Sequence, residues 1–384
     1  MNRGLLSLLI FAVSVVGLTM GATLPLVSLR LHNAGATSLI IGVVSAMPAA
    51  GMILAAALTH LACRHFSGRT LYLGCFVLCT LSAGSVEWLE ASVIPLALAR
   101  LCMGLGMGLI VILGESWVNQ LCNPNTRGQT VAFYAACFTG CQLGGPLLIS
   151  LLGTQSAYPV LIIAMANLVT LALVAYRLPK GLGLHSEGEA RSFSLLGFVR
   201  VAPALCIAVL FFSFFDTVVL SLFPVYATAY GYAVGVAALM ASVILGGDML
   251  FQVPLGWLSD RMDRRALHLG CGLLTLGISL ALPWLIGNPA LLWPALVLLG
   301  AAAGSIYTLA LILIGEDFRG ADLVTANASI GMLWGLGSLA GPLLSGAMME
   351  GNPQGLPLAL CLTASVFALA AFNALRLSRR VLSR

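Results

Sequence analysis

Charged side chains are scarce in this chain of 384 residues: Asp, Glu, Lys and Arg make up 8% of it, against roughly 25% in an ordinary soluble domain. Hydrophobic residues make up 60%. So few charges cannot cover the surface of a 40.0 kDa globule in water. The composition therefore excludes a soluble domain and indicates that most of the chain lies in a lipid bilayer.

Sequence motifs of several enzyme and metal sites are also missing. The chain has no Gly-x-x-x-x-Gly-Lys loop, no His-Glu-x-x-His, no Gly-x-Ser-x-Gly and no Cys-x-x-Cys. Two cysteine pairs four residues apart, Cys75 with Cys79 and Cys137 with Cys141, could hold a soft metal ion, but small packing residues are the favoured interpretation. We therefore predict no enzyme, no direct use of ATP, no cofactor, no metal and no nucleic-acid partner.

The hydrophobic residues form continuous runs of about twenty, the length of a transmembrane helix and not the alternating pattern of a barrel strand. The first run is too long for the core of a secretory signal, so we expect an uncleaved first helix. The fold class is thus an all-α polytopic membrane protein. Twelve spans are predicted, near 5–29, 38–62, 70–86, 93–117, 128–153, 157–176, 201–228, 233–258, 267–286, 290–314, 323–348 and 355–376.

The basic residues predict the orientation of these spans. With the N-terminus in the cytoplasm, all 18 lysines and arginines except Arg30 and Arg100 lie at the cytoplasmic side. The longest polar stretch, residues 177–200, falls at the middle of the chain. We therefore predict a six-helix bundle over 1–176, a cytoplasmic linker over 177–200, a second six-helix bundle over 201–384, and both termini in the cytoplasm.

The two predicted bundles are related by a sequence repeat. A shift of 196 residues aligns Gly51 with Gly247 and residues 71–75 with 267–271. The same shift aligns two further glycine pairs of one helix and the Gly145-Pro146 pair with Gly341-Pro342. A constant shift over four helices predicts two parallel halves related by an axis along the membrane normal. In such folds the interface between the halves is a natural place for a solute to cross.

One loop carries a family signature. The segment 256–265, Gly-Trp-Leu-Ser-Asp-Arg-Met-Asp-Arg-Arg, resembles the cytoplasmic loop motif of the major facilitator superfamily, and Arg100 with Gly104 and Gly106 resembles a second motif of that family. The segment 115–119, Glu-Ser-Trp-Val-Asn, resembles the YcaD-like bacterial permeases within it. The resemblance implies twelve helices in two pseudo-symmetric bundles and a transporter that works by alternating access.

The first half departs from that signature, because Arg64 stands opposite Asp260 in the repeat. We predict an inner gate in which Asp260 meets the start of the helix at 126–128, and an inverted counterpart in which bases near Arg64 meet acids near 316–322. Solvated loop charges are the alternative. The predicted gate residues are Gly256, Asp260, Arg261, Arg264, Arg265, Arg127, Arg64, Asp317 and Asp322.

Charged groups within spans are costly, so each is a functional candidate. Arg100 could bind an anionic group or form a structural charge pair. Asp216, in an apolar span, suits reversible protonation and is the preferred proton site, with a helix–helix hydrogen bond as the alternative. Asp248 and Gln252 share a helix face and could contact a cation or polar solute, or another helix. Glu115 is an inner gate or coupling candidate, or a helix cap.

These observations predict a secondary active transporter for a small organic solute in the bacterial inner membrane. We expect a monomer coupled to protons, with export slightly favoured over uptake because apolar helices with a few acids suit amphipathic cations. A proton-coupled uptake permease and a membrane sensor or scaffold that does not transport are the alternatives. Packing is favoured over a solute-contacting role for Tyr307 and Trp334.

Overall fold

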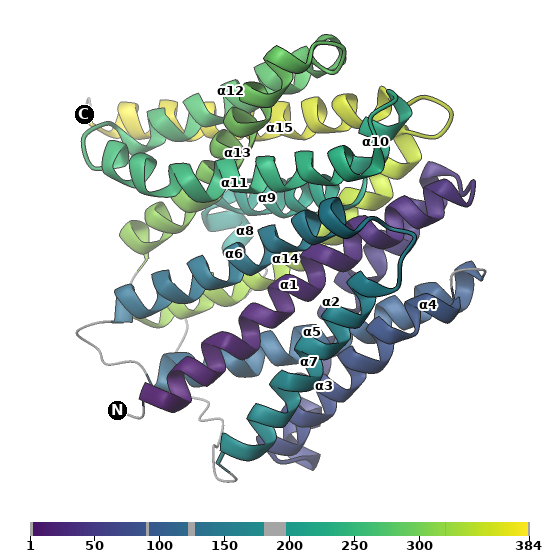
Figure 1. Cartoon of the computed structure of the whole chain (residues 1–384). Coiled ribbons are helices and arrows are strands. Elements are labelled where there is room, and N and C mark those ends of the chain that lie inside the picture. Colours follow the sequence, from purple (N-terminus) through teal and green to yellow (C-terminus); the bar gives the residue numbers. More distant parts are fainter. Residues whose placement is uncertain (1–2, 90–91, 122–126, 180–196, 319, 383–384) are drawn as a thin grey trace. The chain divides into compact units, whose positions relative to one another are not determined.

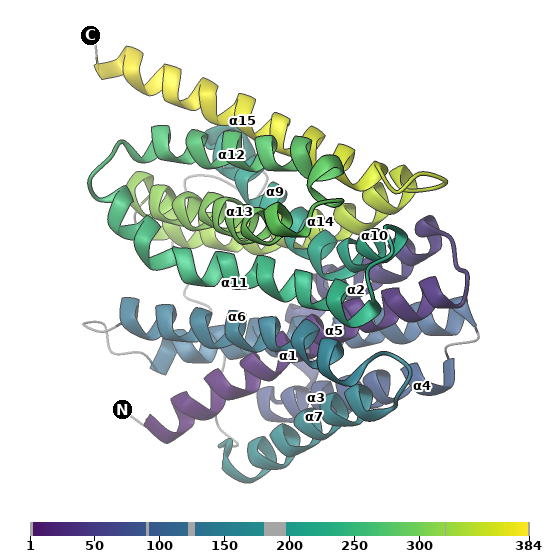
Figure 2. The same ribbon diagram turned by 45° about the horizontal axis from the view of Figure 1, so that its top comes forward.

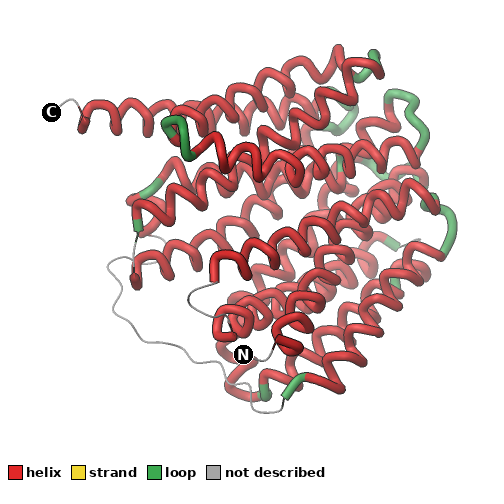
Figure 3. The backbone as a smooth tube through the Cα atoms, turned by 60° about the vertical axis from the view of Figure 1, so that its left-hand side comes forward, coloured by secondary structure: helices red, strands yellow, loops and turns green. Residues whose placement is uncertain are grey.

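The computed structural model describes residues 3–89, 92–121, 127–179, 197–318 and 320–382. In these ranges the chain is helical apart from short connections, as Figure 3 shows in red and green. The part of the chain described contains these helices: α1 (Arg3–Asn33), α2 (Ser38–His65), α3 (Gly68–Gly84), α4 (Val86–Leu89), α5 (Val93–Leu121), α6 (Arg127–Leu152), α7 (Tyr158–Arg177), α8 (Gly197–Val201), α9 (Pro203–Ser221), α10 (Phe223–Ala229), α11 (Val234–Ser259), α12 (Arg264–Leu285), α13 (Pro289–Asp317), α14 (Gly320–Met348) and α15 (Gly355–Leu382).

Twelve of these helices are long and apolar enough to cross a membrane, which confirms the predicted number of spans. The prediction was wrong in one respect, because the span expected over 201–228 is interrupted at Leu222 and continues as the short helix α10. Pro224 lies in the first turn of α10 and has no N–H group to continue the hydrogen bonds of α9. A second short helix, α8, lies at the end of the predicted linker, of which residues 180–196 fall outside the described ranges.

The chain divides into two compact units. Unit 1 comprises residues 1–187 and 233–242, and unit 2 comprises residues 188–232 and 243–384. Within unit 1, α1 packs along α6 and α2 packs along α5 (Figure 1). Within unit 2, α9 packs along α14, and α12 lies beside α15 (Figure 2).

Close contacts between helices recur at the same shift as the sequence repeat. In unit 1, a Cβ atom on Gly108 of α5 would lie 2.9 Å from the Cα of Met52 in α2. In unit 2, a Cβ atom on Gly304 of α13 would lie 2.8 Å from the Cβ of Asp248 in α11. Both members of the second pair stand 196 positions after the first. The neighbouring pairs, Gly104 on Pro48 and Gly300 on Ile244, follow the same rule, so the repeat extends to the packing itself.

Helix ends repeat as well. Ser67 caps α3, where its hydroxyl accepts from the backbone N–H of Thr70 at 3.2 Å. Asp263, 196 positions later, caps α12 and accepts from the N–H of Arg265 at 2.9 Å. Such side chains satisfy backbone donors that have no partner inside the helix. The two caps fix equivalent helix starts in the two units.

Candidate functional site

Three ionisable side chains that the sequence singled out are buried within spans. The exposed fraction is 1% for Arg100 in α5, 3% for Asp216 in α9 and 7% for Asp248 in α11. Their repeat counterparts are apolar: Leu296, Met20 and Met52, respectively. The repeat therefore has an apolar side chain at the counterpart of each of these three positions.

Arg100 is buried without compensation in the described structure. Its Nε, Nη1 and Nη2 atoms have no hydrogen-bond partner among the described residues. One turn along α5, Gly104 closes onto the backbone of Pro48 in α2, which holds the two helices together beside the arginine. Burying a charge without a partner costs several kcal/mol of folding free energy. An anionic group bound at Arg100 would offset that cost.

Asp216 is the one carboxyl group of α9, and it lies among phenylalanines. The rings of Phe211 and Phe215 stack with centroids 6.1 Å apart. The hydroxyl groups of Thr217 and Ser221 donate to backbone carbonyls one turn earlier, at 2.9 and 2.6 Å. These hydroxyls are thus satisfied within α9, and Asp216 is buried in the same span.

Asp248 and Gln252 come together as their spacing predicts. The side-chain amide of Gln252 donates to Oδ1 of Asp248 at 3.4 Å, which is a long hydrogen bond. On its other side the aspartate lies against Gly304 of α13, where no side chain intervenes. Within the ranges described, no basic side chain forms an ion pair with Asp248. This carboxylate is therefore available as the counter-charge of a bound cation.

Glu115 lies near the other end of α5 from Arg100. Fifteen residues of helix separate them by about 22 Å, so they cannot be direct partners, as the spacing predicts. The phenol of Tyr134 in α6 donates to Oε1 of Glu115 at 3.0 Å. This pair connects α5 to α6 at the predicted cytoplasmic end of unit 1.

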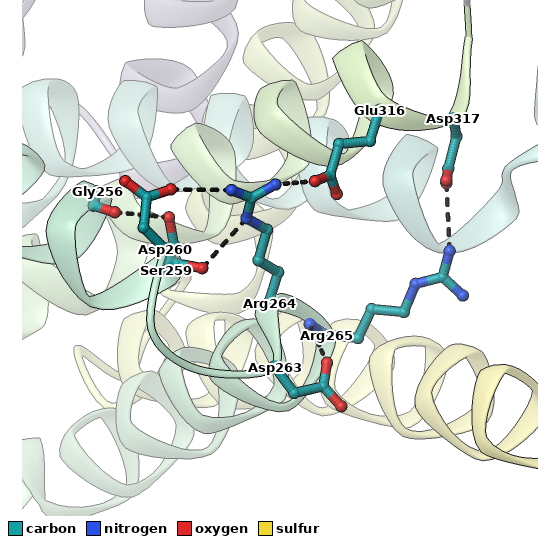
Figure 4. Close-up of polar contacts among 8 residues, drawn as sticks. All are labelled: Gly256, Ser259, Asp260, Asp263, Arg264, Arg265, Glu316 and Asp317. Atoms are coloured by element: carbon teal, nitrogen blue, oxygen red, sulfur yellow. Dashed lines mark hydrogen bonds and ion pairs between the residues drawn. The ribbon is translucent and has the colours of Figure 1, made fainter. Parts of the chain in front are cut away.

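At the predicted cytoplasmic end of unit 2, charged residues join three helices (Figure 4). Arg264 of α12 donates to Asp260 at 2.9 Å and to the backbone oxygen of Ser259 at 3.1 Å, and it also pairs with Glu316 of α13. Arg265 pairs with Asp317 at 3.3 Å. The loop signature thus forms a network within unit 2 that fixes the ends of α11, α12 and α13 to one another.

Several of the predicted gate residues have different roles or lie outside the description. Arg261 places its guanidinium carbon 3.5 Å from the centre of the Trp257 ring, a cation–π contact. Arg64 is exposed in the last turn of α2. The side chains of Arg127 and Asp322 lie outside the described residues, and residues 122–126 do so entirely. The gate interactions predicted with these residues therefore stay predictions.

The arginine that breaks the positive-inside pattern in α1 has a structural role. Arg30 forms an ion pair with Glu87 of α4 at 2.9 Å, and it donates to the backbone oxygens of Thr154 and Ser156 at 2.7 and 3.0 Å. It therefore connects α1, α4 and the loop after α6. Its position at the predicted outer end of α1 is explained by these partners.

One group of aromatic residues was not predicted as a cluster. Phe212 of α9, Tyr307 of α13 and Trp334 of α14 contact one another, with ring centroids 5.1 to 5.5 Å apart. We refer to these three residues as the aromatic triad. Sequence spacing cannot predict such a cluster, because its members lie on three different helices. They come into contact only when these helices pack together in the folded unit.

Comparisons with known proteins agree with this architecture. The family model described as Major Facilitator Superfamily matches residues 9–247 and 205–383. The chain is 26% identical over 358 residues to the protein named uncharacterized MFS-type transporter YfkF of Bacillus subtilis, covering 91% of this chain and 90% of that one. It is 25% identical over 323 residues to the similarly named YcaD of Escherichia coli, covering 81% and 80%.

Solved structures show the same fold. The nucleoside transporter NupG matches with a TM-score of 0.76 at 15% identity, covering 96% of this chain and 99% of that one. A D-xylose-proton symporter matches with a TM-score of 0.74 at 16% identity, covering 95% and 96%. The chain belongs to the major facilitator superfamily, and it is a multi-pass membrane transporter, not an enzyme.

Proposed function

We propose that this chain is a secondary active transporter that moves a small organic solute across the bacterial inner membrane by alternating access and is driven by protons. The observation that carries the proposal is the burial of Arg100, Asp216 and Asp248 at positions where the repeat has apolar residues. A charge within a span costs about 2.5–3.5 kcal/mol on insertion scales. Because the repeat counterparts of all three positions are apolar, we infer that these groups are retained for transport.

Each group has a proposed role. Asp216 carries the proton, because it is the one carboxyl group of α9 and lies buried within a span. Arg100, Asp248 and Gln252 contact the solute, since each offers a polar group deep in a span. Glu115, paired with Tyr134, lies at the inner end and couples closure of that end to the protonation cycle.

The conformational cycle rests on the two halves of the chain. In our proposal residues 1–176 and 201–384 rock against each other about the 177–200 linker, with both termini in the cytoplasm. The network around Arg264 keeps the inner end of unit 2 rigid while it moves. We favour export over uptake, because apolar helices that carry a few acids suit amphipathic cations.

The proposal is tested with purified protein in proteoliposomes that enclose a pH-sensitive dye. A panel of organic solutes is added under an imposed pH gradient, and both solute uptake and lumenal pH are followed. We expect at least one solute to change the lumenal pH, and we expect Asp216→Asn to abolish this change. Glu350→Gln, at an exposed acid outside the spans, is the control and should behave as the native protein.

The sign of the pH change reports the direction of coupling. A solute that accumulates while protons leave the lumen moves by antiport, which supports export, whereas joint entry of solute and protons supports an uptake permease. Solute flux that is the same with and without the pH gradient, and the same in the native protein and in Asp216→Asn, would refute proton coupling. A chain that moves none of the solutes would instead fit a membrane sensor or scaffold.

A further inference from the structure

The internal repeat allows the same helix contact to be compared in the two units. At the α2–α5 contact of unit 1, Gly108 packs on Met52, and at the equivalent α11–α13 contact of unit 2, Gly304 packs on Asp248. The two contacts occupy equivalent positions, but Gly108 meets the backbone of Met52 whereas Gly304 meets the side chain of Asp248. Helix packing explains the glycine in both units, and it does not explain the carboxylate in unit 2.

The aromatic triad is also confined to unit 2. The rings of Phe212 and Tyr307 stack nearly parallel, with centroids 5.2 Å apart. The ring of Trp334 makes a T-shaped contact with each of them, with centroid distances of 5.5 Å to Phe212 and 5.1 Å to Tyr307. Phe212 is buried, whereas Tyr307 and Trp334 are both partly exposed. The positions that correspond to the triad in unit 1 are Val16, Val111 and Phe138.

The carboxylate and the triad are linked through α13, which contacts Asp248 at Gly304 and carries Tyr307. Tyr307 follows Gly304 by three residues, so its side chain lies on the same face of α13, about 4.5 Å further along the axis. Asp248 therefore lies within about one helical turn of Tyr307, the triad residue on α13. The triad residues and Asp248 all occupy the middle of their helices, near the depth at which transporters of this architecture bind solutes.

A carboxylate one helical turn from an aromatic cluster is an arrangement suited to organic cations. Quaternary and tertiary ammonium groups are attracted to the negative faces of tryptophan and tyrosine rings within about 6 Å, and most strongly where water is excluded. Asp248 adds the formal counter-charge, and Gln252 orients it. We propose that unit 2 binds a cationic ammonium group of the solute, with Asp248 as its counter-charge and the aromatic triad as its cation–π surface.

This inference rests on the proposed transport function and adds the chemical class of the solute. It is tested by isothermal titration calorimetry on the full chain in detergent micelles. The probe is benzyltrimethylammonium, and the comparators are uncharged benzyl alcohol and anionic benzoate, which share its ring. We expect saturable binding of the cation and at least about 10-fold weaker binding of either comparator.

Variants assign the binding to these residues. Asp248→Asn should weaken binding of benzyltrimethylammonium at least about 10-fold, and Trp334→Leu should weaken it roughly 3- to 10-fold. The matched controls are Glu350→Gln, at an exposed acid, and Trp284→Leu, whose tryptophan is 77% exposed on α12. Both controls should bind as the native protein does.

A further variant keeps every charge and ring but moves the carboxylate. Gly304→Ala places a methyl group where Asp248 lies and must displace that side chain. Gly315→Ala on the same helix meets no atom within 4 Å and is its control. We expect weaker cation binding in the first variant alone, with melting temperatures recorded to confirm that each variant is folded.

The inference is overturned if benzyltrimethylammonium shows no saturable binding, if Asp248→Asn binds it as tightly as the native chain, or if benzoate binds equally well. These outcomes are separable from failure of the transport proposal. Proton-coupled flux of another solute without cation binding would refute the cationic class alone. Cation binding that depends on Asp248 but no flux of any solute would refute transport and leave the binding site standing.

Discussion

The contact between α1 and α6 in unit 1 depends on the absence of a side chain at Gly145. A Cβ atom there would lie 2.6 Å from the backbone oxygen of Gly21 and would overlap the neighbouring backbone atoms still more closely. Ordinary carbon contacts need about 3.5 Å or more. Gly145→Ala therefore forces the two helices about 1 Å apart, because the atoms it meets belong to backbone and cannot rotate away.

The expected cost of this separation is about 1–3 kcal/mol, the usual range for overpacking, and more if α1 cannot shift. Over a unit of this size, that cost lowers the melting temperature by roughly 2–4 °C per kcal/mol. Thermal unfolding of the purified protein in detergent, followed by tryptophan fluorescence, measures the change. We expect a decrease of roughly 2–12 °C.

Gly140, five residues earlier on α6, supplies the matched control. A Cβ atom at Gly140 meets nothing within 4 Å, so Gly140→Ala should leave stability unchanged or raise it by up to about 1 kcal/mol through helix propensity. If Gly145→Ala melts at or above the native temperature, the close approach of α1 and α6 is wrong. If the two variants are equally destabilised, the glycines of this helix act through flexibility and not through packing.

Three further substitutions follow from named contacts. Arg100→Leu, which restores the residue type of its counterpart Leu296, should leave the melting temperature unchanged or raise it by the equivalent of about 1–4 kcal/mol, and it should impair solute flux in proteoliposomes. Glu87→Gln breaks the ion pair with Arg30 at 2.9 Å and should lower stability by about 1–3 kcal/mol in the same unfolding assay. Arg265→Gln removes a partly exposed pair at 3.3 Å and should cost less than about 1 kcal/mol, with high salt reducing the difference. A destabilised Arg100→Leu, or a Glu87→Gln indistinguishable from the native chain, would contradict the corresponding contact.

The sequence predicted the fold where a single physical rule decides the outcome. Apolar runs must form helices in lipid, so the twelve spans follow from hydropathy. The shift of 196 residues also predicted real contacts, since Gly104 and Gly300 close onto equivalent backbone positions. The break at Leu222 was missed because proline in the first turn of a helix resembles proline within a longer helix when the sequence is considered alone.

The candidate site was only partly accessible from sequence. Charge within a span identified Arg100, Asp216 and Asp248, because such charges are rare and costly. Partners were harder to predict, since they depend on tertiary structure: Glu316, expected near the bases of the first half, pairs with Arg264, and the aromatic triad assembles from three helices. Spacing along one helix predicts its shared faces, as with Asp248 and Gln252, but not the helix that it meets.

The central claim is that the buried ionisable groups serve transport and not folding. It is tested most directly by Asp216→Met, which installs the residue type of the repeat counterpart, Met20. We predict that this variant is folded, with a cooperative melting transition in detergent, and shows no solute-dependent proton flux in proteoliposomes. Proton flux at the native rate would contradict the claim, because Asp216 would then be dispensable for coupling.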